Sequence, residues 1–144
     1  MSLAPFVKHV PLCRRVCGDL ELVRHGTDAV RVLIVDDEML IRWALGQALG
    51  AHRCVVTEAA TAREALAAVR AHDFDVVVMD YRLPDTTHLE LLREVRALSP
   101  ASHVVMMTAF GTPETLNEAM ELGVSRVLEK PIDLDVATRA ILDI

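Results

Sequence analysis

The 144-residue sequence is short of long apolar runs, of basic clusters and of cysteine. No apolar run approaches the roughly 20 residues that span a bilayer, so we predict a soluble protein without a membrane segment. Residues 1–29 also lack the continuous apolar stretch of a secretory signal. Lysine and arginine total 15 against 21 aspartate and glutamate residues, a formal net charge of -6. Direct binding to nucleic acid by this piece is not expected, because contacts to phosphates need a basic face.

Two of the three cysteines lie near histidines in the N-terminal segment and raise the question of a zinc site. Cys13 and Cys17 have the spacing C-x₃-C, but His9 and His25 are scattered around them, so reduced thiols in an ordinary extension are the favoured interpretation. LVRHGT in the same segment is similar to the phosphohistidine motif of the phosphoglycerate mutase family. That fold needs far more chain after the motif than remains here. Cys54 falls in a predicted strand as a small core residue.

Short apolar runs alternate with amphipathic segments along the rest of the chain. Apolar residues make up 52% of the sequence, which suits a parallel sheet covered by helices on both faces. Predicted strands occupy residues 31–35, 53–57, 74–79, 103–107 and 125–128. Predicted helices occupy residues 38–49, 61–71, 89–98, 113–121 and a last stretch from 133 onward. Five β/α units predict one α/β domain over residues 30–144, with residues 1–29 as an extension that is expected to be disordered or partly artefactual.

Polar residues directly follow four of the predicted strands. Asp36 and Asp37 come after RVLIV, Asp80 after DVVVM, Thr108 after HVVMM and Lys130 after RVLE. In an open parallel sheet, ligands bind beyond the carboxyl ends of the strands. The sequence therefore predicts that these five side chains face one site.

Three carboxylates in one site favour a bound cation, because like charges raise one another's pKa. Oxygen ligands without histidine or cysteine suit Mg²⁺, which takes one or two protein carboxylates and keeps places for phosphate oxygens. Lys130 adds a positive charge and Thr108 a hydroxyl, and both suit a phosphoryl group carried by an aspartate. Taken singly, Asp36 or Asp37 can cap the next helix, Thr108 can serve a turn and Lys130 can be a solvated charge. Their occurrence at successive strand ends favours an aspartyl phosphate site.

Four motifs make residues 30–144 resemble the receiver domain of bacterial two-component response regulators. They are VLIVDDE, VVVMDYRLPD, VVMMTAFG and VLEKPID, each at a predicted strand end and separated by helix-sized segments. Within that family, MTAFGTPETLNEAMELG and LEKPID are most similar to receivers of nitrogen-regulation-type transcriptional activators. The resemblance implies a flavodoxin-like (βα)5 doubly wound parallel sheet with strand order 2-1-3-4-5.

The resemblance also implies a function for the acidic site. A sensor histidine kinase would transfer a phosphoryl group to Asp80, with Thr108 and Lys130 contacting the phosphoryl oxygens. The Lys130–Pro131 bond would be cis. The implied Mg²⁺ ligands are oxygen atoms of Asp36, Asp37, Asp80 and, through its backbone carbonyl, Arg82. Such a domain is a cytoplasmic signalling switch rather than an enzyme, although it catalyses its own phosphoryl transfer and slow autodephosphorylation.

The output face implied by the resemblance consists of the helix after Pro113, strand 125–128 and the last helix. Phosphorylation would shift the pairing of this face with a second receiver, giving a homodimer, or with an output domain beyond residue 144. Transcription regulation is the expected output. We expect the sequence to be a fragment of a longer regulator.

Two positions depart from the family pattern. An aromatic residue usually stands three positions before the lysine and swings inward after the threonine moves, but this chain has Val127. Coupling between Thr108 and the output face must then be weaker, or use Arg126 or Leu128 differently. His88 stands where the family usually has glycine, and histidine tolerates a positive φ better than most residues do.

Two other classes of protein compete with a phosphorylated receiver. A receiver-like interaction module that works without phosphorylation is supported only by Val127 and His88. A phosphatase of the haloacid dehalogenase class also uses an aspartate nucleophile and Mg²⁺, but it requires a second aspartate two residues later. This chain has Arg82 at that position, which argues against the phosphatase.

Overall fold

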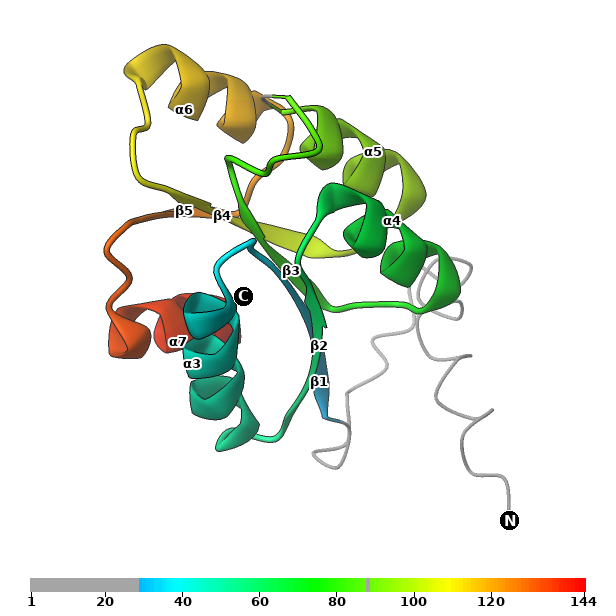
Figure 1. Cartoon of the computed structure of the whole chain (residues 1–144), viewed down its shortest axis with the longest axis vertical. Helices are drawn as coiled ribbons and strands as arrows, with labels where there is room; N and C mark the ends of the chain where they lie inside the picture. Colours follow the sequence, from blue (N-terminus) through cyan, green and yellow to red (C-terminus); the bar gives the residue numbers. More distant parts are fainter. Residues whose placement is uncertain (1–28, 88) are drawn as a thin grey trace, which may run out of the picture.

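The computed structural model describes residues 29–87 and 89–144, and in this part of the chain five parallel strands form one sheet (Figure 1). The strand order is β2-β1-β3-β4-β5, which confirms the predicted topology. The strands are β1 (Val30–Val35), β2 (Cys54–Ala59), β3 (Val76–Asp80), β4 (His103–Thr108) and β5 (Arg126–Glu129). The helices are α3 (Met39–Gly50), α4 (Ala62–Ala71), α5 (Glu90–Leu98), α6 (Pro113–Glu121) and α7 (Leu134–Leu142). Each helix follows a strand, as parallel pairing requires.

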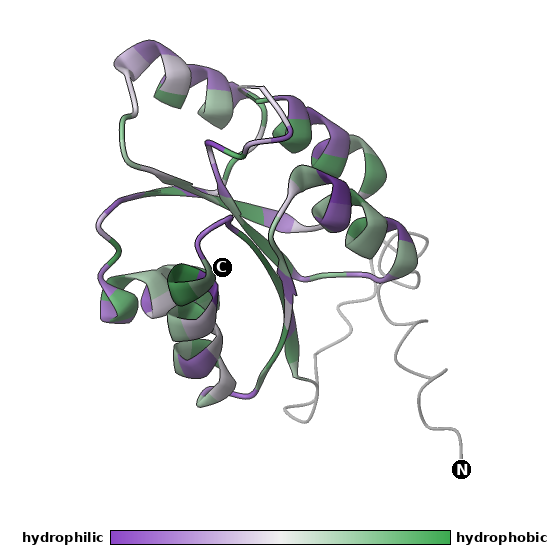
Figure 2. Ribbon diagram, viewed as in Figure 1, coloured by the Kyte–Doolittle hydropathy of each residue, from purple (hydrophilic) through white to green (hydrophobic). Residues whose placement is uncertain are grey.

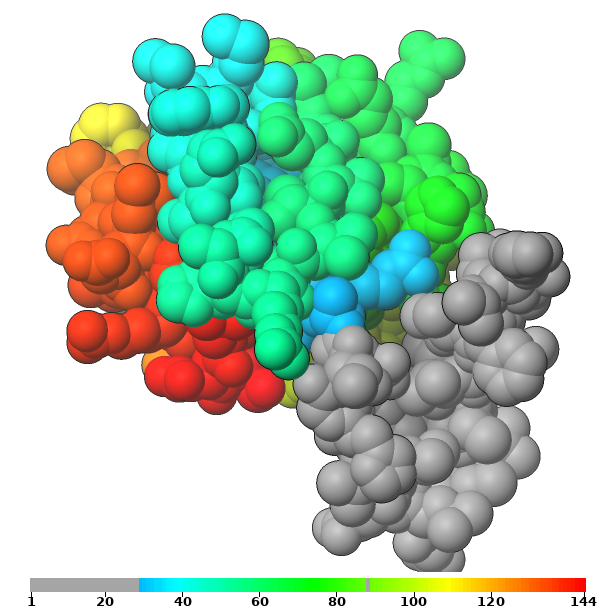
Figure 3. All heavy atoms as spheres, turned by 90° about the horizontal axis from the view of Figure 1, so that it is seen from below, coloured from blue at the N-terminus to red at the C-terminus, as the bar shows by residue number. Residues whose placement is uncertain are grey.

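Helices cover both faces of the sheet. α3 and α7 pack on one face and lie side by side, as Figure 3 shows on the molecular surface, while α4, α5 and α6 pack on the other. In β1, Leu33 and Val35 belong to the apolar layer under α4 and α5, whereas Val32 and Ile34 belong to the layer under α3 and α7. Successive side chains of a strand point to opposite faces, so a strand buried on both faces has a continuous apolar sequence. Figure 2 shows hydrophobic residues along the central strands and a mixture of hydrophilic and hydrophobic residues on the covering helices. The outer side of α3 exposes Met39, Leu40 and Trp43.

Capping residues set the starts of two helices. The Thr61 hydroxyl accepts a hydrogen bond from the Glu64 N–H at 3.1 Å, and the Glu64 carboxylate accepts one from the Ala60 N–H at 2.7 Å. This reciprocal pair is a capping box at the start of α4. Asp133 caps α7 by accepting from two N–H groups of its first turn at 3.0 and 3.1 Å. The Lys130–Pro131 peptide bond is cis, as predicted.

Three strands begin later than their sequences suggest, β5 by one residue and β2 and β3 for visible reasons. Arg53 has a φ of 57°, in the left-handed region, so β2 starts after it and continues to Ala59. The predicted third strand includes Phe74 and Asp75, but both precede β3. Asp75 is instead bonded to Arg31, donating its N–H to the Arg31 carbonyl at 2.8 Å and accepting the Arg31 N–H on Oδ2 at 2.9 Å. The Asp75 carboxylate thus takes the Arg31 N–H at the start of the strand, and an apolar pattern does not reveal that bond.

Candidate functional site

Four of the predicted site residues lie at the carboxyl edge of the sheet. Asp36 follows β1, Asp80 ends β3, Thr108 ends β4 and Lys130 follows β5. The Lys130 N–H donates to the Thr108 carbonyl at 2.8 Å, which continues the pairing of β4 with β5. The parallel sheet therefore brings together residues that are distant in sequence.

Lys130 bridges two buried aspartates. Its Nζ lies 2.9 Å from Oδ2 of Asp36 and 3.0 Å from Oδ2 of Asp80. A third carboxylate, that of Glu38, lies 3.4 Å from the same nitrogen. The exposed fractions of the side chains are 0% for Asp36, 7% for Asp80 and 12% for Lys130. Ion pairs this well shielded from water make strong hydrogen bonds, and loss of one partner leaves a buried charge uncompensated.

The pKa values of two members of this network are shifted. Burial by itself lowers the pKa of Lys130, but hydrogen bonds to Asp36 and Asp80 outweigh it, so the pKa lies well above its ordinary value. Burial raises the pKa of Asp36, and the hydrogen bonds that it accepts from the Glu38 N–H and from Lys130 oppose the rise only in part. Lys130 therefore stays an ammonium group at all physiological pH values.

Each buried aspartate is also fixed by its own loop. Oδ1 of Asp36 accepts the Glu38 N–H at 2.8 Å, and Oδ1 of Asp80 accepts the Arg82 N–H at 3.1 Å. In both residues the other oxygen faces Lys130. Arg42 on α3 adds a third anchor by donating Nη1 to the Asp36 carbonyl at 2.8 Å. Both carboxylates are thus oriented before any ligand arrives.

Asp36, Asp37 and Glu38 form an acidic cluster, in which one carboxylate oxygen from each residue lies within 4.8 Å of the others. Asp36 is buried, whereas Asp37 and Glu38 are exposed. With Asp80 included, four carboxylates lie at this edge, and those of Asp36, Glu38 and Asp80 pair with the ammonium group of Lys130. A surplus of negative oxygen donors beside solvent fits a hard divalent cation such as Mg²⁺. That the backbone carbonyl of Arg82 is a Mg²⁺ ligand stays a prediction.

Thr108 is almost fully buried, and its hydroxyl is engaged with its own loop. Oγ1 accepts the Phe110 N–H at 3.3 Å, so in this state the hydroxyl stabilises a turn, as one of the sequence interpretations predicted. The hydroxyl proton can still be donated to another acceptor. The Phe110 ring lies under the Arg82 guanidinium, with 5.7 Å from the guanidinium carbon to the ring centroid. This contact joins the loop after β3 to the loop after β4.

Sequence reasoning missed two residues at this edge. Glu38 was predicted only as a helix start, yet it makes no cap bond with its side chain and faces Lys130 instead. The triplet Asp-Asp-Glu was the available signal. Asp85 accepts hydrogen bonds from the Ala62 and Arg63 N–H groups at 2.9 and 3.0 Å, and so caps α4 from a distant loop. No local pattern marks a cap that lies 23 residues from its helix.

Several predictions fall on residues that the structure does not describe. The possible zinc ligands Cys13, Cys17, His9 and His25, the LVRHGT motif and His88 all lie outside the described residues.

Asp36 and Asp37 are both placed, and neither is the N-cap of α3, because that position is occupied by Glu38. The interpretation of these aspartates as helix caps is therefore wrong.

Comparison with known proteins gives matches over most of the chain. Residues 32–142 match the family model of the response regulator receiver domain. The chain is 36% identical over 108 residues to the transcriptional regulatory protein ZraR of Escherichia coli (strain K12), covering 75% of this chain and 24% of ZraR. It is 34% identical over 106 residues to the DNA-binding transcriptional regulator NtrC of Salmonella typhimurium, covering 74% of this chain and 23% of NtrC. This chain thus spans about a quarter of the length of these relatives.

A solved structure agrees with the fold. The response regulator receiver domain protein (CheY-like) from Methanospirillum hungatei JF-1 has a TM-score of 0.77 and 29% sequence identity, covering 81% of this chain and 93% of that one. In the described residues, no helix is long and apolar enough to cross a membrane.

Proposed function

This chain belongs to the response regulator receiver domain family, with relatives of the NtrC type, and on that premise we propose that Asp80 accepts a phosphoryl group from a sensor histidine kinase. The observation that carries the proposal is the setting of Asp80. It ends the central strand, its side chain is 7% exposed, and Lys130 lies 3.0 Å from it. A fixed cation beside a shielded carboxylate stabilises the extra negative charge of a phosphoryl group.

The proposed transfer forms one bond and breaks one. An Asp80 oxygen attacks the phosphorus of a phosphohistidine in line, the phosphorus–nitrogen bond breaks, and the histidine nitrogen keeps the electron pair. Lys130, which is already bonded to Asp80, then pairs with a phosphoryl oxygen. The Thr108 hydroxyl gives up the Phe110 N–H and donates its proton toward another phosphoryl oxygen.

The residues suited to hold Mg²⁺ beside Asp80 are Asp36, Asp37 and the backbone carbonyl of Arg82. When bound, the ion supplies positive charge against the phosphoryl oxygens. The orientation of the Asp36 carboxylate is fixed by its neighbours, because Lys130 donates to one of its oxygens and the Glu38 N–H donates to the other. Asp37 is exposed and has no such constraint, so it can adjust to the ligand.

The domain is a signalling switch. We infer that the same groups catalyse the slow loss of the phosphoryl group, in which a water oxygen attacks phosphorus, the bond to Asp80 breaks and inorganic phosphate leaves. Because a kinase has to reach Asp80 with its own phosphohistidine, we place this activity in the cytoplasm.

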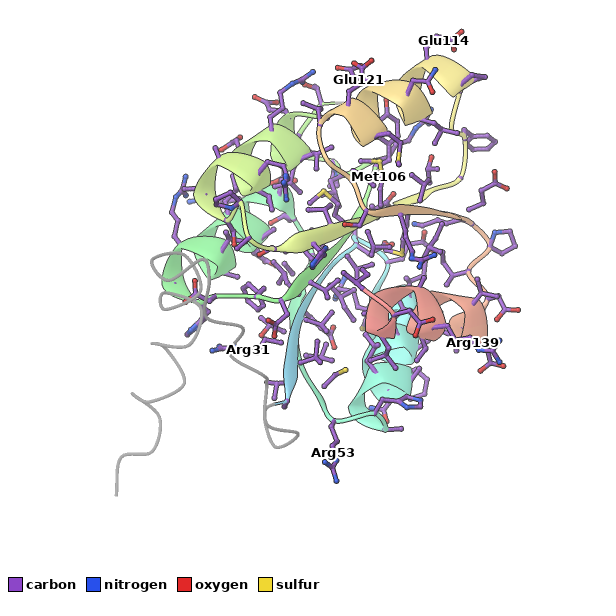
Figure 4. The ribbon with its side chains drawn as sticks, turned by 180° about the vertical axis from the view of Figure 1, so that it is seen from behind. Arg31, Arg53, Met106, Glu114, Glu121 and Arg139 are labelled. Atoms are coloured by element: carbon purple, nitrogen blue, oxygen red, sulfur yellow. The ribbon has the colours of Figure 1, made fainter. Side chains whose placement is uncertain are left out.

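The readout is proposed at the α6–β5–α7 groove, a shallow depression of about 660 Å³. Its apolar lining comes from Leu116, Met120, Val127 and Val136, with Arg126, Arg139 and Asp143 also on its walls. Glu114 and Glu121 project from α6, and Arg139 projects from α7 (Figure 4). In an isologous dimer a glutamate of α6 in one copy can face Arg139 of α7 in the other, so we propose a homodimer through this groove. In a longer regulator, an output domain is the other partner, and transcription regulation is the proposed outcome.

A second function is favoured by one observation, the valine at position 127. A receiver without an aromatic ring there can act as an interaction module that needs no phosphorylation. Titration with beryllofluoride, which mimics a phosphoryl group on aspartate, separates the two functions. A phosphorylatable receiver changes its dimer equilibrium on titration, whereas the module does not.

Phosphorylation itself is tested by mass spectrometry after incubation with acetyl phosphate and Mg²⁺. The native chain should gain the mass of one phosphoryl group, and Asp80→Asn should gain none. Asp73→Asn is the matched control, because it removes an aspartate that precedes β3, at the opposite edge of the sheet, and should still gain the phosphoryl mass. Asp80→Asn protein that still gains the phosphoryl mass would show that Asp80 is not the acceptor.

A further inference from the structure

Glu38 occupies the N-cap position of α3 but does not cap the helix. Its backbone is extended, with a φ of -83° and a ψ of 109°, yet its side chain makes no cap hydrogen bond. The first turn of α3 also contains no acidic residue. Because the N–H groups at a helix start carry partial positive charge, a carboxylate here is expected to stay with the helix unless another partner draws it away.

That partner is Lys130. Oε1 of Glu38 lies 3.4 Å from Nζ of Lys130. The same nitrogen lies 2.9 Å from Asp36 and 3.0 Å from Asp80. An ammonium group has three N–H donors and no acceptor. The three carboxylates therefore occupy every donor of Lys130, and no other described carboxylate pairs with it.

The three carboxylates differ in how firmly they are held. Asp36 is fully buried and also accepts the Glu38 N–H, so the loss of Lys130 would leave its charge without compensation. Asp80 is 7% exposed and is itself the proposed phosphoryl acceptor. Glu38 makes the longest of the three contacts and its side chain is 60% exposed, so water can replace the lysine at little cost. Glu38 is thus the carboxylate that gives up Lys130 most easily.

A phosphoryl group on Asp80 requires a donor from Lys130 as well. The oxygens of Glu38 and Asp80 that contact this lysine share one nitrogen, so they lie within about 6 Å of each other, where like charges interact strongly. A phosphoryl group adds negative charge at that point together with further acceptor oxygens. Glu38 therefore opposes the phosphoryl group twice, by occupying an N–H donor and by its charge.

We propose that Glu38 is a positioning residue that competes with the phosphoryl group for Lys130 and is displaced into solvent when Asp80 is phosphorylated. The inference rests on the proposed phosphorylation of Asp80. In the free protein Glu38 holds the third donor of the ammonium group, and this lowers the affinity of the site for a phosphoryl group. Once released, its carboxylate can return to the start of α3, where a negative charge is favourable.

The competing role for Glu38 is that of a Mg²⁺ ligand, because one of its oxygens clusters with those of Asp36 and Asp37. The two roles predict opposite effects of removing the carboxylate. A competitor for Lys130 weakens the binding of a phosphoryl group, so its removal raises that affinity. A metal ligand supports the binding of Mg²⁺, so its removal lowers both affinities.

Two titrations separate these roles. Fluorine NMR at saturating Mg²⁺ measures the affinity for beryllofluoride, and isothermal titration calorimetry measures the affinity for Mg²⁺ alone. Glu38→Gln removes the charge, and Glu38→Ser removes the carboxylate while supplying a favoured N-cap hydroxyl that maintains the stability of the fold. Glu129→Gln is the matched control, because Glu129 is exposed, precedes Lys130 in the sequence and is not among the three carboxylates that pair with it.

Both Glu38 variants should bind beryllofluoride about twofold to fivefold more tightly than the native chain, as the loss of one exposed ion pair allows. The gain should shrink in about 1 M sodium chloride, because salt screens exposed charges. Affinity for Mg²⁺ alone should fall much less than in Asp37→Asn, which removes a proposed ligand. A substitution that only loosens the fold does not raise the affinity for a ligand, so a purely structural role of Glu38 cannot give this result.

Unchanged or weaker binding of beryllofluoride in both Glu38 variants overturns the competition. An equal gain in Glu129→Gln also overturns it, because the effect would then follow from net charge alone. A loss of Mg²⁺ affinity as large as that of Asp37→Asn would make Glu38 a metal ligand instead. Failure of the native chain to bind beryllofluoride has a different meaning, because it would remove the proposed function and the competition with it.

Discussion

The acidic edge of the sheet and the α6–β5–α7 groove belong to the same proposed switch but are built differently. At the edge, Asp36, Asp80 and Lys130 are nearly buried and joined at 2.9 and 3.0 Å. In the groove, apolar side chains stay partly in water, with Met120 53% and Val136 56% exposed. Buried charges tolerate no loss of a partner, whereas half-exposed apolar side chains adapt to change. The difference predicts large effects of substitution at the edge and small ones in the groove.

The strongest test of that contrast is Lys130→Met, which keeps the length of the side chain and removes its charge. Two buried carboxylates then lose their common cation, and the expected loss in free energy of unfolding is about 3 kcal/mol without metal. Urea unfolding followed by circular dichroism measures it.

Arg93→Met is the matched control for the lysine variant. Arg93 pairs with Glu118 on the surface, where both side chains are about half exposed, and such a pair contributes about 0 to 1 kcal/mol. Equal losses in the free energy of unfolding of the two variants would mean that the burial of the Lys130 network does not strengthen its ion pairs.

Magnesium gives the next largest effect, because a cation relieves the repulsion among the carboxylates at the edge. If the dissociation constant is of order 1 mM, then 10 mM Mg²⁺ stabilises the fold by about 1.4 kcal/mol. Thermal unfolding with and without Mg²⁺ measures the shift, which should be absent in Asp37→Ala. A shift of the same size in that variant would place the ion elsewhere.

Which residues gather at the edge was more predictable from sequence than the contacts that they make there. Asp36, Asp80, Thr108 and Lys130 could be assigned because each stands at the end of an apolar run, and a parallel sheet has only one carboxyl edge. Glu38 and Asp85 could not, because their roles depend on which distant group reaches them in three dimensions. Asp75 shows the same limit for strand boundaries, since its bond to Arg31 lies outside any local pattern.

A substitution of Asp85 tests the effect of charge without that of burial, because Asp85 is charged but exposed, unlike Asp36 and Asp80. Burial raises the pKa of Asp85, but hydrogen bonds from the Arg63 and Ala62 N–H groups together outweigh it and leave the pKa below its ordinary value of 3.8. A depressed folded-state pKa stabilises the fold above the unfolded value and loses that contribution as the pH falls through the folded value. Asp85→Ala should therefore cost about 1 kcal/mol at pH 7, as other lost helix caps do.

The pH dependence is the check on that explanation. Urea unfolding of the native chain and of Asp85→Ala should give free energies that converge as the pH falls below about 4. A difference that stays constant down to pH 3 would mean that the carboxylate charge plays no part in the cap.

The smallest expected effect is on dimerisation through the groove, because Val127 cannot swing a ring into the core when Thr108 moves. Coupling between two sites is limited by the differential contacts of the two states, and a full switch from 1:99 to 99:1 needs about 5.5 kcal/mol. With one source of coupling missing, beryllofluoride should change the dimer dissociation constant of the native chain by less than about fivefold, the low end of allosteric coupling. Val127→Tyr should enlarge that change, since it supplies the ring on a half-buried strand position facing the α6 layer. Analytical ultracentrifugation of both proteins, with and without beryllofluoride, gives the four constants. A native chain that already responds as strongly as Val127→Tyr would show that position 127 does not limit the switch, and that the coupling runs through the backbone instead.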